Sequence, residues 1–175
     1  MIIFNALFEI GKELLNWIDI YSPDNVKKHY SMPLSGMIEN STMNLLRIIH
    51  YPPLAIQRTD NAIRAAAHGD INLITVLPAG SESGLQVKGL SGGWNKLECN
   101  PKWLIINSGD MLNECSSGYY PSTIHRVINP KGDATKLSRY TIPVFIHPRD
   151  NVVLSDKYTA RSFLDERLKE IGLKS

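Results

Sequence analysis

Short apolar runs separated by turn residues fill the sequence from residue 45 to residue 146, and this alternation limits the folds open to the chain more than any other feature. Each run has the length of a β-strand, and the turns between them are rich in Gly, Pro, Asn and Ser. The runs are LLRIIHY (45–51), INLITVL (71–77), GLQVKG (84–89), WNKLEC (94–99), KWLIINS (102–108), STIHRVI (122–128) and RYTIPVFI (139–146). Many short strands joined by such turns predict a mainly β fold, built as an antiparallel sandwich, barrel or jelly roll.

A helix is expected at each end of this β region. Near the N-terminus, five apolar residues recur at helical spacing and predict an amphipathic helix that packs on the rest of the protein. They are Ile3, Leu7, Ile10, Leu14 and Trp17. We predict a single domain that spans residues 1–175. Its parts are a packing helix in 1–30, a β core in 45–150 and a C-terminal helix in 156–172.

Charge and cysteine content exclude several classes of function. The net charge is only +2 and the basic residues are dispersed, so neither nucleic acid nor a membrane surface is an expected partner. The two cysteines, Cys99 and Cys115, form neither a disulfide framework nor a CxxC metal motif. Glu9, Lys12 and Glu13 interrupt the first apolar stretch, which leaves no targeting or membrane-spanning segment. We therefore expect a cytoplasmic protein.

Two candidate metal ligands, His68 and Asp70, directly precede an apolar run. In an extended backbone, residues i and i+2 project to the same side, so both side chains can reach one ion. His125, in a later run, is the third candidate ligand. Two histidines and one carboxylate can occupy one face of an octahedral ferrous ion and leave the opposite positions for substrate and oxygen. Zinc uses the same ligand types, so these residues alone do not select the metal.

Arg139 and Thr141 form a second candidate site. They lie two residues apart in the last apolar run and therefore on one face of a strand. An arginine that points into a barrel interior is costly unless an anion meets it, and a guanidinium beside a hydroxyl suits a carboxylate. Together with the metal triad, this pair indicates a small dicarboxylate that chelates iron at one end and is anchored at the other.

These motifs resemble the isopenicillin N synthase-like branch of the 2-oxoglutarate- and Fe(II)-dependent dioxygenases. The resemblance covers roughly residues 45–155 and includes H-x-D at 68–70 and a distal His followed by Arg-Val at 125–127. At 139–141 the chain has R-x-T where the family usually has R-x-S, which keeps the hydroxyl. The resemblance implies a distorted double-stranded β-helix, or jelly roll, flanked by the two helices.

By position, the resemblance implies a role for each matched residue. The catalytic iron ligands are matched by His68, Asp70 and His125. Arg139 and Thr141 match the pair that holds the distal carboxylate of 2-oxoglutarate, and Tyr51 matches a tyrosine that assists the same carboxylate. The implied cofactors are Fe(II), 2-oxoglutarate as cosubstrate and O2. The implied reaction oxidises a small organic substrate, most commonly by hydroxylation, while 2-oxoglutarate is decarboxylated to succinate.

Two other functions fit the same residues. An Fe(II) oxidase of the isopenicillin N synthase type would use the Arg139 pocket for a substrate carboxylate, without 2-oxoglutarate. A truncated, non-catalytic jelly-roll binding module is the alternative outside the enzymes, because the sequence begins within a long helix of the family pattern. An incomplete sheet would also leave an edge through which the chain could associate.

Overall fold

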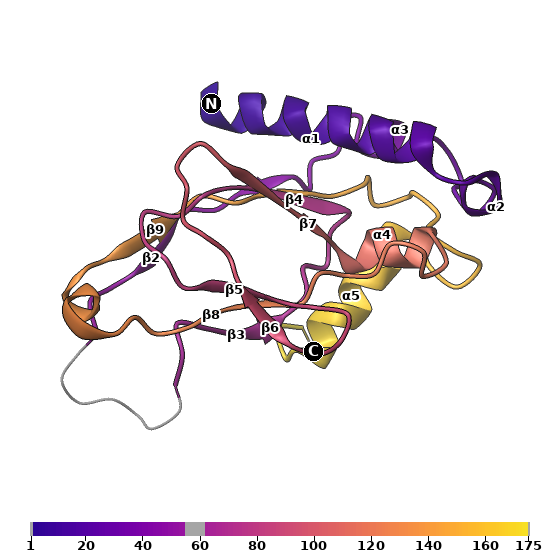
Figure 1. The fold of residues 1–175 in the computed structure, drawn as a ribbon. Coiled ribbons are helices and arrows are strands. Elements are labelled where there is room, and N and C mark those ends of the chain that lie inside the picture. The colour runs from indigo at the N-terminus through magenta and orange to yellow at the C-terminus, as the bar shows by residue number, and fades with distance from the viewer. Residues whose placement is uncertain (1, 55–61, 175) are drawn as a thin grey trace.

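The computed structural model describes residues 2–54 and 62–174, which form helices around three antiparallel sheets (Figure 1). A long helix comes first and a shorter one last, as the sequence predicted. The helices are α1 (Ile2–Tyr21), α2 (Asp24–Lys27), α3 (Leu34–Met37), α4 (Asp110–Cys115) and α5 (Ala160–Glu170), with a short 3-10 helix, η1 (Gly132–Lys136). Within these described ranges, no helix is both long enough and apolar enough to cross a membrane.

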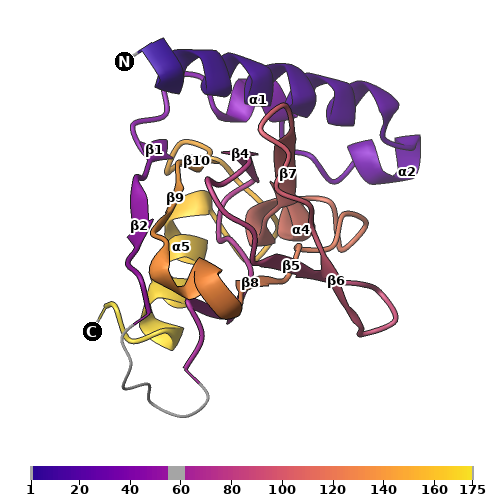
Figure 2. The ribbon, with the colours of Figure 1, turned by 60° about the vertical axis from the view of Figure 1, so that its left-hand side comes forward.

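The described strands pair only in the antiparallel sense, which confirms the coarse expectation of a β protein with antiparallel sheets. The first sheet has the order β1 (Leu45–Leu46), β10 (Val144–Ile146), β4 (Ile74–Pro78) and β7 (Leu104–Ser108). The second pairs β2 (Ile49–Tyr51) with β9 (Arg139–Thr141). The third has the order β3 (Ala65–His68), β8 (His125–Val127), β5 (Leu85–Lys88) and β6 (Trp94–Lys96). Figures 1 and 2 show the first and third sheets as two layers, with the β2–β9 pair at one end.

The segments 45–51 and 139–146 each read as one apolar run but are split into two strands. β1 pairs with β10 in the first sheet, and β2 pairs with β9 in the second, so the two segments form one antiparallel ladder that crosses between sheets. Pro143 lies at the crossing, where it cannot donate a backbone hydrogen bond, and its carbonyl accepts from the Arg47 N–H at 3.0 Å. The ladder therefore reaches from the core at one end to the second sheet at the other.

The face on which the N-terminal helix packs overlaps the predicted one only in part, since Leu7 is buried and Leu14 packs against the core. α1 buries Leu7, Gly11 and Leu15. Members of the predicted stripe that are exposed instead are Ile3, Ile10 and Trp17. A Cβ at Gly11 would overlap the Ile146 side chain, so the missing side chain lets the helix approach β10 closely. Periodicity identified the helix, but this close approach at a glycine decides which face is buried.

The main core lies between the first sheet and the helices α1, α3, α4 and α5. Its buried members include Leu15, Leu34, Met37, Ile74, Val76, Met111, Leu112, Ile146 and Phe163. The last helix is fixed at its start by a capping box, in which the Thr159 hydroxyl accepts from the Ser162 N–H at 3.2 Å and the Ser162 hydroxyl accepts from the Thr159 N–H at 3.0 Å. The helix is shorter than the predicted 156–172, and Gly172, shortly after its last residue, has a φ of +73°, the left-handed conformation that favours glycine.

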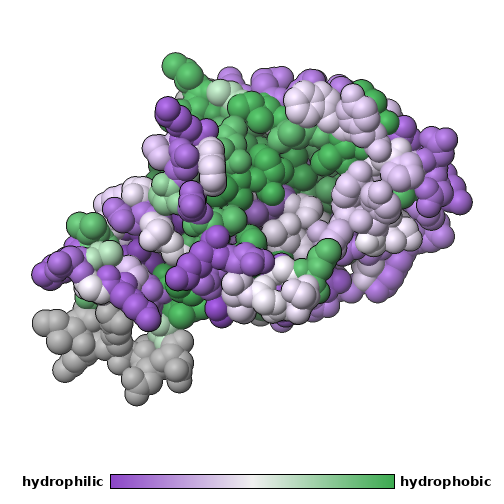
Figure 3. All heavy atoms as spheres, in the orientation of Figure 1, coloured by the Kyte–Doolittle hydropathy of each residue, from purple (hydrophilic) through white to green (hydrophobic). Residues whose placement is uncertain are grey.

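α1 covers only part of the outer face of the first sheet. It lies over β10 and β4, whereas the next strand, β7, exposes Leu104 and Ile106 at 41% and 37%. In the view of Figure 3, apolar side chains gather below α1 over this part of the sheet. In the described part of the chain, β7 is also the last strand at this edge of the sheet.

Candidate metal and carboxylate-binding site

The structure brings His68, Asp70 and His125 together. His68 ends β3 and His125 begins β8, and the two are direct partners in the antiparallel ladder. Asp70 lies in the turn between β3 and β4. One ligand atom from each residue lies within 4.8 Å of the others, and the distance from His125 Nε2 to Asp70 Oδ1 is 3.9 Å. Three ligand atoms at this spacing can bind one metal ion.

The backbone fixes the tautomer of both histidines. His68 Nδ1 lies 2.8 Å from the Ala66 carbonyl oxygen, and His125 Nδ1 lies 2.9 Å from the Thr123 carbonyl oxygen. A carbonyl oxygen can only accept, so Nδ1 of each ring carries the proton and donates. Nε2 of each ring is then left with its lone pair, as a metal ligand requires.

Asp70 is oriented by a short chain of side-chain hydrogen bonds. The Thr75 hydroxyl donates to Asp70 Oδ2 at 2.6 Å, and Asn72 Nδ2 donates to the Thr75 oxygen at 2.9 Å. These three residues are at most 6% exposed. The bonds hold one carboxylate oxygen, and the other, Oδ1, faces His125. Such second contacts orient metal ligands and tune their affinity.

The start of α4 clamps the backbone around Asp70. The Gly109 N–H donates to the Leu73 carbonyl at 2.9 Å, and the Asp110 N–H donates to the Asp70 carbonyl at 2.8 Å. A Cβ at Gly109 would overlap the carbonyl oxygen of Asn72. Glycine is therefore the residue that lets the end of β7 pack against the turn that carries Asp70.

Arg139 and Thr141 project from β9 and are 2% and 7% exposed. Arg139 Nε donates to the Glu82 carbonyl at 3.0 Å, but among the described residues neither Arg139 Nη1 nor the Thr141 hydroxyl has a partner. Tyr51 is opposite Arg139 in the β2–β9 register, with its ring centre 5.3 Å from the guanidinium carbon. Burial lowers the pKa of Arg139, but a guanidinium stays charged in proteins. A buried charge of this kind needs an anion beside it.

One cavity joins the two groups of side chains. All six residues singled out in the sequence line it: His68, Asp70, His125, Arg139, Thr141 and Tyr51. The rest of its wall is mostly apolar, with Leu77, Leu85 and Val127 among its members, but it also contains the polar residues Thr75 and Asn107. His68 is the exposed member of the triad, so the cavity meets solvent at the metal end. The cavity can therefore hold a metal ion near its mouth and a carboxylate at Arg139.

An antiparallel β fold that presents two histidines and one carboxylate beside open space is typical of the non-haem iron oxygenases. The sequence places the chain in that class. Residues 42–148 match the family model of the 2OG-Fe(II) oxygenase superfamily, and the chain belongs to this family. The family resemblance inferred from the motifs is thereby confirmed.

Relatives in other organisms support the assignment. The chain is 28% identical over 143 residues to a 2-oxoglutarate-Fe(II) type oxidoreductase of Aspergillus fumigatus, covering 81% of this chain and 40% of the relative. The crystal structure of a candidate oxygenase from Shewanella oneidensis matches with a TM-score of 0.87 and 54% identity, over 97% of this chain and 62% of that one. The crystal structure of a full-length Neurospora crassa protein in complex with alpha-KG matches with a TM-score of 0.67 and 26% identity, over 76% of this chain and 46% of that one. The chain thus spans less than half the length of the curated relatives it matches.

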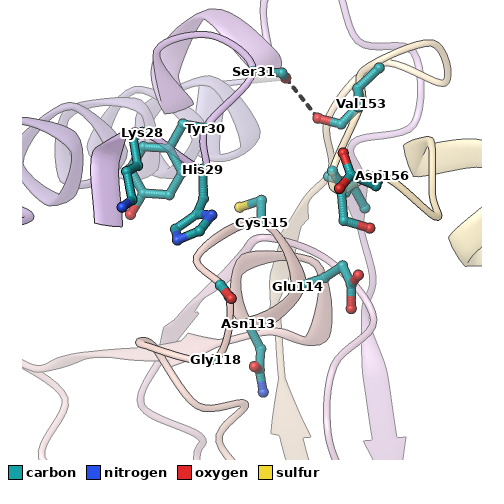
Figure 4. Close-up of a pocket in the computed structure, with 13 residues that line it drawn as sticks. Lys28, His29, Tyr30, Ser31, Asn113, Glu114, Cys115, Gly118, Val153 and Asp156 are labelled. Atoms are coloured by element: carbon teal, nitrogen blue, oxygen red, sulfur yellow. Dashed lines mark hydrogen bonds between the residues drawn. The ribbon is translucent and has the colours of Figure 1, made fainter. Parts of the chain in front are cut away.

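A larger cavity, of about 680 Å³, lies apart from these residues (Figure 4). It lies between the segment after α2, the end of α4 and the loop before α5, where the Ser31 hydroxyl donates to the Val153 carbonyl at 2.7 Å. Burial raises the pKa of Cys115 in its wall to about 12, so this thiol stays protonated. Among the described residues, its walls contain neither a metal-ligating cluster nor a buried polar side-chain atom without a partner. Nothing in this cavity indicates a ligand.

Two residues of the site were not singled out in the sequence. Thr75 and Asn107 both line the cavity, Thr75 next to Asp70 and Asn107 across the ladder from Thr75. Thr75 is flanked by apolar residues on both sides, and that interruption is a signal that could have identified it. Asn107 is followed by Ser108 at the end of its run, so it gives no such signal.

Proposed function

We propose that this protein is an Fe(II)- and 2-oxoglutarate-dependent oxygenase that hydroxylates a small organic substrate. The observation that carries the proposal is one cavity that contains both a metal-binding triad and a buried guanidinium whose Nη1 has no partner in the described part of the chain. The triad can hold iron with positions left open, and the guanidinium can hold one end of a dicarboxylate. Family membership and the alpha-KG complex of the Neurospora protein support 2-oxoglutarate as that dicarboxylate.

Iron would be held by Nε2 of His68, Nε2 of His125 and the carboxylate of Asp70. Bound together with 2-oxoglutarate, iron supplies the O2 chemistry that couples decarboxylation to succinate with oxidation of the substrate. The protein keeps both imidazoles in the tautomer that offers Nε2 and fixes the carboxylate through Thr75. Such contacts hold the ligand atoms in the orientation that a metal site requires.

Arg139 and Thr141 would hold the distal carboxylate of 2-oxoglutarate. Nη1 of Arg139 and the Thr141 hydroxyl are both buried donors, and they lie on the same face of β9. The Glu82 carbonyl and the Tyr51 ring restrict the orientation of the guanidinium. A fixed fork positions the dicarboxylate so that its keto-acid end reaches the metal.

We also infer the finer organisation of the molecule. The two facing sheet layers support a distorted jelly-roll core in 45–150, with a packing helix in 1–30 and the last helix in 156–172. The low net charge supports a small-molecule substrate rather than nucleic acid or a membrane. The two free cysteines support a cytoplasmic location.

Anaerobic titration of 2-oxoglutarate into the Fe(II)-loaded protein tests the proposal. Chelation of iron by a keto acid produces a charge-transfer absorption in the visible, so we expect a saturable band in the wild type. Arg139→Ala should weaken 2-oxoglutarate binding severely. Removal of one partner of a buried ion pair typically costs about 3–5 kcal/mol, or roughly two to four decades in affinity. Iron content should not change, because the ligands are intact. A folded, iron-loaded wild type without the band would contradict the proposal and favour the Fe(II) oxidase or the binding module.

A further inference from the structure

Asn107 is a buried amide without a partner, among the described residues, in the wall of the cavity. It lies in β7, is 1% exposed, and lines the same cavity as the metal set. Its Oδ1 and Nδ2 are both buried, and no described residue hydrogen-bonds to either atom. A buried amide in this condition destabilises the protein until a group in the cavity bonds to it. The amide therefore indicates a ligand group at this point of the cavity.

The register of β7 places Asn107 near the metal end of the cavity. In the β4–β7 ladder Asn107 is opposite Thr75, whose hydroxyl donates to Asp70. The residue two places earlier on the same face, Ile105, lines the space beside Arg139. A dicarboxylate that extends from Arg139 to the metal therefore passes Ile105 first and reaches Asn107 close to its metal-bound end.

We propose that Asn107 binds the chelating end of the keto acid, with its Nδ2–H donating to the carboxylate that coordinates the metal. This inference rests on the proposed function. A coordinated carboxylate keeps lone pairs that the metal does not use, and a neutral amide can donate to them without adding charge to the site. Asn107 and Arg139 then act on opposite ends of the same dicarboxylate.

The variant Asn107→Leu tests the inference, because leucine has a similar volume and no polar atoms. Removal of two unpaired buried atoms should raise the melting temperature of the metal-free protein by about 2–4 °C. In the anaerobic Fe(II) protein, the same variant should bind 2-oxoglutarate about 10- to 100-fold more weakly, the value of one hydrogen bond to a charged group. Iron affinity should be unchanged, because no ligand is altered.

Pyruvate separates the two ends of the cosubstrate, because it has the chelating keto-acid group without the distal carboxylate. Asn107→Leu should weaken the binding of 2-oxoglutarate and the binding of pyruvate by the same factor, so the ratio of the two affinities should not change. Arg139→Ala, in contrast, should abolish most of the preference for 2-oxoglutarate over pyruvate. A merely structural asparagine would give neither the higher melting temperature nor the equal loss of affinity for both keto acids.

Any of the following outcomes would overturn the inference. Equal affinity of the wild type and Asn107→Leu for both keto acids would show that the amide does not contact the cosubstrate. Weaker binding of 2-oxoglutarate with unchanged binding of pyruvate would place the contact of Asn107 at the distal carboxylate. A metal-free variant that melts below the wild type would assign Asn107 to the fold. A wild type that binds no keto acid would contradict the proposed function itself, and the inference with it.

Discussion

Asp70 is the member of the triad whose orientation depends on other side chains. The histidines are oriented by backbone carbonyls two residues earlier in the chain, which almost any sequence could supply. The carboxylate depends instead on the Thr75 hydroxyl, which is held in turn by Asn72. At the scale of single residues, the weakest point of the proposed metal site is therefore Thr75.

Thr75→Val should weaken metal binding without removing a ligand. Valine keeps the shape of threonine but cannot donate to Asp70 Oδ2, and loss of such a contact typically costs about 10- to 100-fold in metal affinity. Calorimetric titration with Mn(II), an inert substitute for Fe(II), measures the change. Thr141→Val is the matched control, because its hydroxyl lines the same cavity but does not contact Asp70. The control variant should leave Mn(II) binding intact and weaken the binding of 2-oxoglutarate by about 1–2 kcal/mol. Equal Mn(II) affinities of the two variants would contradict the role given to Thr75.

The sequence predicted the residues whose spacing is itself informative. His68 and Asp70 are two apart, as are Arg139 and Thr141, and a spacing of two puts side chains on one side of an extended chain. Asn107 gives no such pattern, because an isolated polar residue in a strand can face a cavity, a neighbouring layer or solvent. Only the assembled sheets decide which face of a strand closes on the cavity.

At the scale of elements, the ladder between 45–51 and 139–146 connects packing to chemistry. Its β1–β10 half belongs to the first sheet, and its β2–β9 half sets Tyr51 opposite Arg139. The apolar runs predicted strands here, but the split at Pro143 was not predictable from apolar pattern alone. The predicted packing face of α1 was only partly right for a similar reason, since the contact of Gly11 with Ile146 joins distant parts of the chain.

Gly109→Ala should break the junction between β7 and α4. The added Cβ meets the Asn72 carbonyl oxygen, which is backbone and cannot turn aside, so we expect a loss of about 1–3 kcal/mol in the free energy of unfolding. Metal affinity should fall too, because the displaced turn carries Asp70. Urea unfolding and Mn(II) titration measure the two effects.

Gly93→Ala is the control for this change. A Cβ at Gly93 has no described atom within 4 Å, so the substitution should alter stability by less than about 0.5 kcal/mol. If Gly109→Ala is as stable as Gly93→Ala, the close contact between Gly109 and the Asn72 carbonyl does not limit the residue at position 109.

At the scale of the whole molecule, the uncovered part of the first sheet predicts self-association. β7 exposes Leu104 and Ile106 beside the region covered by α1, and apolar sheet edges of this kind pair with other chains. A double variant, Leu104→Lys with Ile106→Lys, should shift the sedimentation of the protein toward the monomer. Leu90→Lys, which changes a leucine that is 98% exposed elsewhere, should not. A wild type that sediments as a monomer at every concentration would contradict this prediction.

On the function proposed here, one cavity binds a metal ion and a dicarboxylate together. The most direct test is a crystal structure of the chain with Mn(II) and 2-oxoglutarate. We predict one ion bound by His68, Asp70 and His125, the keto-acid end of 2-oxoglutarate on that ion, and its distal carboxylate on Arg139 and Thr141. An ion bound at other residues, or a 2-oxoglutarate molecule that does not reach Arg139, would contradict the claim.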